Sequence, residues 1–311
     1  MVVAVLTLSV ACGAPGVDGG TKDAVGAPPP RFVGVLADGS VVLARTADGS
    51  VERTLMERGS GAHRDRSIQL LDDGRTLYVW TGEFGECGSL VRTSVDGGPG
   101  VTVLDRVRAW SVSGDGRTLA HTDGPYLGKG CNEPLTVVVR NLADGKEQRW
   151  TRRQGPDELH AGVGELFWVR APRYLDWVTC GADTCAPALL DTERTGSLDE
   201  ATLRDTSSDE ASPPTGLGYD WFPSSMAMRG RRGTIVFSVD YSSTDGSENH
   251  PIVEADAMTQ RVRRVLFDEP GAPLDFDVTG AFMLFRHERL SWWSSSDRLV
   301  PIADGFVDAS W

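Results

Sequence analysis

The side chains most able to do chemistry in this sequence are its histidines and acids. His63, His160 and His250 fall in expected loops, and His121 and His287 close expected strands. With nearby acids they could ligate zinc, for which imidazole and carboxylate are usual ligands. The acids that could join these histidines around a metal are Asp123, Asp157, Glu158 and Glu288. Neither HxH nor HExxH spacing occurs, so we favour the alternative of unrelated surface residues and predict no metal and no cofactor.

Motifs for nucleophilic or nucleotide chemistry are also absent from the sequence. It contains no GxSxG, no P-loop and no GxGxxG between a strand and a helix. Paired carboxylates for glycoside hydrolysis stay open as an alternative, because acids such as Asp209-Glu210 and Asp268-Glu269 are plentiful. The run 205–210 is more typical of a solvated insertion. We therefore predict no catalytic residue.

The amino terminus predicts export. Residues 2–11 form an apolar run that is too short to span a bilayer and fits the core of a signal peptide. The following segment, Ser9-Val10-Ala11-Cys12, resembles a bacterial lipobox, whose cysteine is lipidated. We expect a signal peptide over 1–12, a flexible linker over 13–30 and a folded domain over 31–311. The alternatives are a secreted protein and an ordinary apolar amino terminus.

Two stretches, 67–81 and 109–122, share a strand, an Asp-Gly turn and a second strand that opens with Arg-Thr-Leu. Asp-Gly supplies the positive φ that a hairpin turn needs. Weaker copies follow at 166–180, 226–239 and 274–285. Self-similarity of this kind is the signature of a propeller or a solenoid. Two more strand-like runs follow each copy, which predicts units of four strands, A to D.

The two ends of the chain complete one further unit. Residues 31–56 contain three short strands without a first one, and the terminal sequence FVDASW, 306–311, can supply it. When FVDASW is aligned with 107–110, Trp311 takes the place of Trp110. The sequence thus predicts an all-β, six-bladed propeller whose first blade is closed by the C-terminal strand. A seven-bladed ring is the alternative, with an extra blade over 152–223.

The pattern AWSxxGDGRTLA, with a following xVxxLxDG strand, resembles the propeller of TolB and related WD-like repeat proteins of bacterial envelopes. The resemblance covers 31–311 and is strongest over 67–122. It implies a six-bladed propeller in an envelope protein, but it implies function poorly, because propellers carry unrelated activities.

The long connections of this propeller are expected on one face of the ring. A–B and C–D turns lie on one face, and B–C and D–A connections lie on the other, which we call the long-loop face. Its long connections are 83–88, 123–134, 154–162, 204–220 and 241–250. Because loops on a rigid scaffold usually carry binding, this face is the candidate site. Its candidate residues are His63, Asp123, Tyr126, Asp157, His160, Trp221, Phe222 and His250.

The same layout pairs four cysteines. An even number in an exported chain predicts disulfides, and C-x4-C spacing is a poor zinc match. Cys87 and Cys131 lie in B–C loops of adjacent blades, while Cys180 and Cys185 face each other across a short connection. We predict the pairs Cys87–Cys131 and Cys180–Cys185.

Charge narrows the class of partner. The formal net charge of −13 argues against nucleic acid and against electrostatic membrane binding. We expect a non-catalytic extracytoplasmic propeller, anchored to the membrane through Cys12, that binds a protein, peptide or glycan through the long-loop face. The alternative is an envelope hydrolase or lyase with a metal in the central channel.

Overall fold

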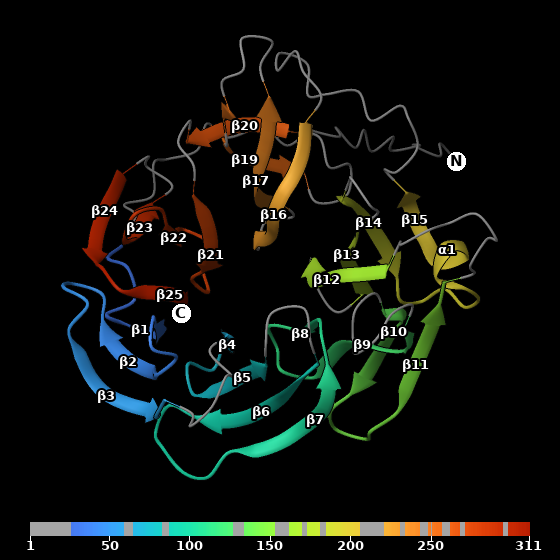
Figure 1. The fold of residues 1–311 in the computed structure, drawn as a ribbon, viewed down its shortest axis with the longest axis horizontal. Coiled ribbons are helices and arrows are strands. Elements are labelled where there is room, and N and C mark those ends of the chain that lie inside the picture. Colours follow the sequence, from blue (N-terminus) through green and yellow to red (C-terminus); the bar gives the residue numbers. More distant parts are fainter. Residues whose placement is uncertain are drawn as a thin grey trace, which may run out of the picture.

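The computed structural model describes residues 26–58, 65–82, 87–126, 134–152, 162–169, 173–180, 185–205, 221–230, 234–242, 248–249, 251–256, 262–267, 271–294 and 298–311. In these residues the chain forms six antiparallel sheets, which stand around a common centre as the blades of a propeller (Figure 1). The innermost strand of each blade is strand A and the outermost is strand D.

The strands follow the chain from blade to blade. Blade 1 contains β25 (Phe306–Ser310), β1 (Arg31–Leu36), β2 (Val41–Arg45) and β3 (Val51–Met56). Blade 2 contains β4 (Asp65–Leu70), β5 (Thr76–Gly82), β6 (Gly88–Ser94) and β7 (Val101–Val107). Blade 3 contains β8 (Trp110–Val112), β9 (Thr118–Tyr126), β10 (Pro134–Asn141) and β11 (Glu147–Thr151).

The second half of the ring is built in the same way. Blade 4 contains β12 (Gly162–Val169), β13 (Tyr174–Cys180), β14 (Cys185–Asp191) and β15 (Thr202–Asp205), with helix α1 (Leu198–Ala201) before β15. Blade 5 contains β16 (Trp221–Gly230), β17 (Thr234–Ser242), β19 (Ile252–Asp256) and β20 (Val262–Phe267), with β18 (Glu248–Asn249) paired to β17. Blade 6 contains β21 (Ala272–Phe276), β22 (Phe282–Arg286), β23 (Leu290–Ser294) and β24 (Arg298–Ala303).

Blade 1 confirms the prediction that the C-terminal strand closes the ring. β25 pairs antiparallel with β1, with Ser310 opposite Val33 and Ala309 opposite Gly34. A Cβ atom at Gly34 would lie 2.5 Å from the ring of Phe306, so only glycine fits beneath that ring. The five predicted strand–turn–strand copies are the A and B strands of blades 2 to 6. The seven-bladed alternative is wrong.

The predicted alignment of Trp311 with Trp110 is wrong by two residues. Blades 1 and 3 share the same C–D turn, in which Gly49 and Gly145 each donate to the carbonyl four residues earlier. When the blades are aligned on that turn, Ala309 matches Trp110 in the strand ladders. Trp311 is nevertheless buried, at 9% exposure, and packs edge-on against Phe282 of blade 6 at 6.3 Å between ring centroids.

The A–B turns explain why Asp-Gly marks the repeat. Gly74, Gly116 and Gly280 occupy equivalent turn positions in blades 2, 3 and 6, with φ of 63°, 70° and 69°. Each donates its N–H to the carbonyl three residues earlier. A positive φ is strained for a side-chain-bearing residue and costs glycine little, so the sequence fixes these turns locally.

A repeated hydrogen bond joins the innermost strands of neighbouring blades. In each case a polar side chain near the end of strand A in one blade accepts a hydrogen bond from a backbone N–H at the end of strand A in the next blade. Trp311 N donates to Asp275 Oδ2 at 3.0 Å, Leu70 N to Ser310 Oγ at 2.8 Å, and Val112 N to Gln69 Oε1 at 2.9 Å. These bonds, which we call clasps, link blades 6, 1, 2 and 3 in order.

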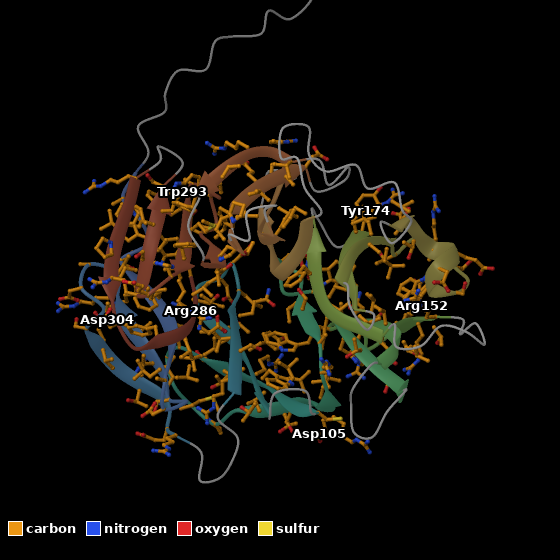
Figure 2. The ribbon with its side chains drawn as sticks, turned by 45° about the horizontal axis from the view of Figure 1, so that its top comes forward. Asp105, Arg152, Tyr174, Arg286, Trp293 and Asp304 are labelled. Atoms are coloured by element: carbon orange, nitrogen blue, oxygen red, sulfur yellow. The ribbon has the colours of Figure 1, made fainter. Side chains whose placement is uncertain are left out.

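Apolar side chains fill the space between adjacent sheets (Figure 2). Trp150 and Trp168 are fully buried between blades 3 and 4. Trp292 packs in the cluster between blades 6 and 1, and Trp293 packs in the cluster between blades 5 and 6. These adjacent tryptophans therefore point to opposite faces of one blade.

Not all elaboration lies on the long-loop face. The C–D connection of blade 4, on the opposite face, contains α1, which begins at a capping box formed by Ser197 and Glu200. Leu198 and Ala201 of α1 are fully buried in the core between blades 3 and 4. On the long-loop face, by contrast, blade 1 has only the tight turn 37–40. The expected asymmetry thus fails at blades 4 and 1.

In the described part of the chain, no helix has the length and apolarity that crossing a membrane would require.

Candidate functional site

One predicted binding residue, Asp123, has a described side chain. Tyr126 ends β9, while Trp221 and Phe222 begin β16, but the side chains of these three lie outside the described residues. His63, Asp157, His160 and His250 lie outside them altogether. Their common site therefore stays a prediction, and the described part of the candidate site centres on Asp123.

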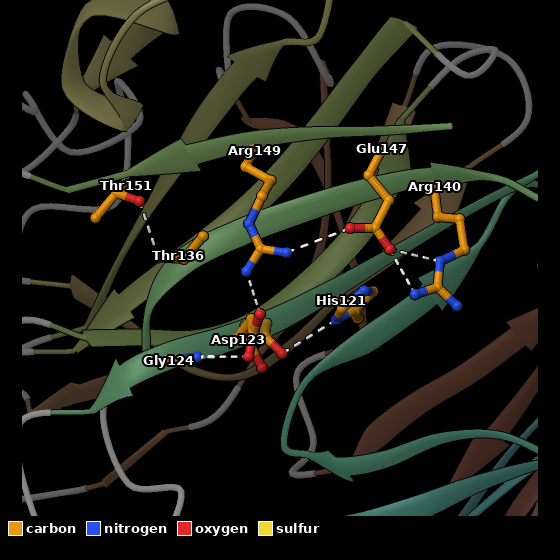
Figure 3. Close-up of polar contacts among 9 residues, drawn as sticks. His121, Asp123, Gly124, Thr136, Arg140, Glu147, Arg149 and Thr151 are labelled. Carbon is orange, nitrogen blue, oxygen red and sulfur yellow. Dashed lines mark hydrogen bonds and ion pairs between the residues drawn. The ribbon is translucent and has the colours of Figure 1, made fainter. Parts of the chain in front are cut away.

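Asp123 belongs to a row of charged residues on one face of blade 3. Strand register places Asp123 opposite Thr136, and Arg140 opposite Glu147. Arg149 is on the same face, because side chains two residues apart on β11 point the same way. We call Asp123, Arg140, Glu147 and Arg149 the charged ladder, which Figure 3 shows in close-up.

Ion pairs connect the charged ladder from end to end. Arg140 Nε donates to Glu147 Oε1 at 2.7 Å, and Arg149 Nη1 lies 3.3 Å from Glu147 Oε2. The other end of the Arg149 guanidinium donates to Asp123. Asp123 Oδ1 also accepts the backbone N–H of Gly124 at 2.8 Å. Each carboxylate therefore has a cationic partner, and the four charges balance.

These contacts keep both acids ionised. Hydrogen bonds and charge from Arg140 lower the pKa of Glu147. Burial opposes ionisation of Asp123, but the hydrogen bonds from Arg149 and Gly124 and the charge of Arg149 outweigh it and lower the pKa. The bond to Asp123 in turn raises the pKa of Arg149. An acid with a lowered pKa holds no proton at neutral pH and makes a poor general acid.

His121 lies on β9 beside the ladder and is only 6% exposed. Its Nδ1 lies 3.2 Å from the carbonyl of Thr122, and its Nε2 has no hydrogen-bond partner. Burial lowers the pKa of His121, assisted by the charge of Arg140 and opposed by Asp123 and Glu147. His121 is thus neutral at neutral pH. His121 and Asp123 are near enough for the charge of each to shift the pKa of the other, but the hydrogen bond of His121 in Figure 3 is that of Nδ1 with the Thr122 carbonyl.

The ladder is suited to binding polar groups. In the described residues no group of three His, Cys, Asp or Glu side chains could hold a metal ion. The side chains of Arg149 and Asp123 are 47% and 44% exposed, so solvent or a partner can reach this end of the ladder. β9 continues from Asp123 to Tyr126 and then into 127–133, so the exposed end borders the long-loop face.

The cysteine predictions are tested only in part. Cys180 and Cys185 are directly opposite each other in β13 and β14, as the short connection predicts. Cys87 is disulfide-bonded, but Cys131 lies outside the described residues. Both predicted pairings therefore stay predictions.

Arg140, Glu147 and Arg149 were not among the site residues predicted from the sequence. A usable signal was present, because Glu147 and Arg149 alternate with Gln148 and Trp150 along a predicted strand. That alternation puts the charges on one face and the fully buried Trp150 on the other.

No protein-family model matches the chain. No curated protein matches it either. Among solved structures, a chain of the nidogen/laminin complex has a TM-score of 0.55 at 11% identity, covering 90% of this chain and 97% of its own. The tricorn protease has a TM-score of 0.52 at 8% identity, over 91% of this chain and 36% of its own. At such identities these likenesses show the fold alone.

A protein from Agrobacterium tumefaciens described as TolB has a TM-score of 0.44 at 14% identity, covering 78% of this chain and 83% of its own. At that TM-score the likeness carries no conclusion about this chain.

Proposed function

We propose that the chain is a non-catalytic propeller outside the cytoplasm that binds a protein, peptide or glycan through the long-loop face. The observation that carries the proposal is the exposed end of the charged ladder, where Arg149 and Asp123 border that face. Exposed ion pairs are weak, so a partner can exchange its own polar groups for them at little cost.

The proposed location rests on the sequence. Residues 2–11 and Cys12 form the signal and lipobox-like segment, and 13–30 form the linker, which would keep the propeller within reach of a lipid anchor. A Cys12→Ser variant should lose membrane association while it keeps the fold. Fractionation together with mass measurement of the mature amino-terminal peptide tests this. An unlipidated Cys12 would leave a secreted propeller.

Partner capture tests the choice of face. We expect deletion of 206–220, between β15 and β16, to abolish capture of an envelope partner after mild crosslinking. A finer test is the double variant D123N/R149Q, which should weaken binding of the captured partner about tenfold, as expected for loss of charged hydrogen bonds.

The same blade offers a matched control. Lys146 and Asp144 form an exposed ion pair at 3.1 Å in the C–D turn, on the opposite face. The double variant D144N/K146Q removes the same charges and should leave binding unchanged. If it weakens binding as much as D123N/R149Q, or if the 206–220 deletion leaves capture intact, the proposed face is wrong. Stoichiometric zinc or calcium in the purified protein, lost on chelation together with an activity, would instead support an enzyme.

A further inference from the structure

Arg66 is a buried arginine near the start of β4, the innermost strand of blade 2. It pairs with Thr81 of β5, and β4 begins at the D–A connection, which places Arg66 toward the long-loop face. Side chains two residues apart on a strand point the same way, so Arg66 shares a face with Ile68 and Leu70. Those two residues pack against the apolar cluster between blades 1 and 2. Arg66 therefore lies at the boundary of these blades.

Most of the hydrogen-bonding capacity of the Arg66 guanidinium is unused. The residue is 9% exposed, and its Nη2 donates to the carbonyl of Glu57 at 3.1 Å. Its Nε and Nη1 are buried and have no hydrogen-bond partner. Arg66 also forms no ion pair with an acid in the part of the chain that the structure describes. Within those residues, the Glu57 carbonyl is its one polar partner.

Asp38 is the acid whose charge reaches Arg66, but it does not serve as the counterion. Burial lowers the pKa of Arg66, and the charge of Asp38 opposes that shift. Asp38 lies in the turn 37–40 of blade 1, where its Oδ1 accepts the backbone N–H of Ser40 at 2.8 Å. The charge of Asp38 thus acts on Arg66 without a hydrogen bond between the two side chains.

A buried guanidinium with so few partners points to a missing anion. Arginine stays protonated in folded proteins, so Arg66 carries a positive charge away from water. Buried charges are normally paired, because an uncompensated buried ion is strongly destabilising. An anion beside the guanidinium would supply the missing charge and acceptors for the unpaired N–H groups.

The chemistry of the site favours a small carboxylate as this anion. One guanidinium balances one negative charge, so a monoanion neutralises Arg66, whereas a phosphate dianion would leave surplus charge at the boundary. A carboxylate is also planar and matches the N–H groups of a guanidinium plane. Since Nε and Nη1 are covered, the ligand has to displace neighbouring atoms to reach them, which favours a group of few atoms over a bulky one.

We propose that Arg66 binds a small monocarboxylate between blades 1 and 2, at the long-loop face. The site is separate from the charged ladder, which lies on blade 3, so the proposal goes beyond the proposed function and does not depend on it. Binding and folding are linked, because the bound anion pairs a charge that the folded chain otherwise buries alone.

Acetate is the probe, added to the full chain in place of chloride at constant ionic strength. A ligand of the folded state raises the melting temperature in a saturable way. We expect this rise for sodium acetate and no saturable rise for sodium phosphate. An NMR titration with isotope-labelled acetate gives the dissociation constant.

Variants separate ligand binding from a merely structural role. R66M removes the cation but keeps an unbranched side chain, so acetate should no longer raise the melting temperature. Without acetate, R66M should be at least as stable as wild type, because it removes an uncompensated buried charge. R66K should bind acetate about tenfold more weakly, since it loses the planar guanidinium. D38N should bind acetate more tightly, because Asp38 no longer repels the anion.

The matched control is R58Q. Arg58 follows β3 and is exposed, so this variant removes the same charge outside the buried site. It should bind acetate as wild type does, within about twofold, because exposed charges are well screened.

The proposal is overturned if wild type shows no saturable rise, or if acetate raises the melting temperatures of wild type and R66M equally, which would be a general salt effect. It is also overturned if R66M is less stable than wild type by the same amount with and without acetate. Should R66M fail to fold, R66K and D38N still decide, since equal acetate affinity in wild type and both variants would contradict the site.

Discussion

Blades 1 and 3 have equivalent strands and the same C–D turn, yet their polar side chains lie on different strands. In blade 3 the charges lie mainly on the outer strands β10 and β11, where they pair with one another near solvent. In blade 1 the polar groups of β25 lie on the innermost strand, where they bind neighbouring blades. The charged ladder of blade 3 therefore lies at the surface of one blade, whereas the polar groups of β25 join the split blade to blades 6 and 2.

Loss of the closing strand should cause the largest fall in the free energy of unfolding. A chain shortened after Gly305 loses the buried Phe306, Ala309 and Trp311 and the two clasps on either side of β25. Loss of one large buried aromatic costs ~3–5 kcal/mol, so we expect loss of cooperative unfolding or a fall of several kcal/mol in unfolding free energy. Thermal and urea denaturation measure it. Val307→Ala, at an exposed position of β25, is the control and should change little.

Loss of a clasp between two contiguous blades should cause an intermediate fall in the free energy of unfolding. Gln69 makes two hydrogen bonds to the backbone of Val112, through Oε1 at 2.9 Å and Nε2 at 2.6 Å. Gln69→Ala should lower the free energy of unfolding by about 1–3 kcal/mol, because it leaves a partly buried backbone N–H and carbonyl unpaired. The matched control is Gln148→Ala, since Gln148 makes one exposed bond to the carbonyl of Arg194. If both variants lost the same free energy of unfolding, the clasp would not stabilise the ring more than an exposed hydrogen bond does.

Loss of ion pairs in the charged ladder should cause the smallest fall in the free energy of unfolding. Arg149→Ala removes ion pairs to Asp123 and Glu147, but its side chain is 47% exposed. Exposed pairs are worth about 0–1 kcal/mol and are screened by salt. We expect a fall below about 1 kcal/mol that shrinks at high ionic strength. A loss as large as that of Gln69→Ala would mean that the ladder stabilises the fold, which would weaken its assignment to binding.

The blades were predictable because their signals are local. Asp-Gly turns fix hairpins through a positive φ, and Gly74 and Gly116 mark two of them. The closing strand was also predictable, since 31–56 lacks a first strand and 306–311 can supply one. The position of Trp311 was not, because an aromatic residue can be buried at either of two places on the same strand face.

The clasps could not be predicted from the sequence. Gln69 and Val112 are 43 residues apart, and Leu70 and Ser310 are 240 apart, so only the closed ring shows that they meet. Helix α1 was missed because its four residues are too few for a periodic pattern. Its capping box, Ser197 with Glu200, was the available signal.

An engineered disulfide tests the split blade most directly. Val33 and Ser310 are direct partners in the β1–β25 ladder, so Val33→Cys with Ser310→Cys should form a bond under mild oxidation. Mass spectrometry would then find the tryptic peptides 32–45 and 299–311 linked. The control pairs Val33→Cys with Val307→Cys, which lies further along β25 and should stay unlinked. The predicted result is that the Val33→Cys/Ser310→Cys variant forms the disulfide and the control does not. If that variant stays unlinked, or links no faster than the control, closure by β25 is contradicted.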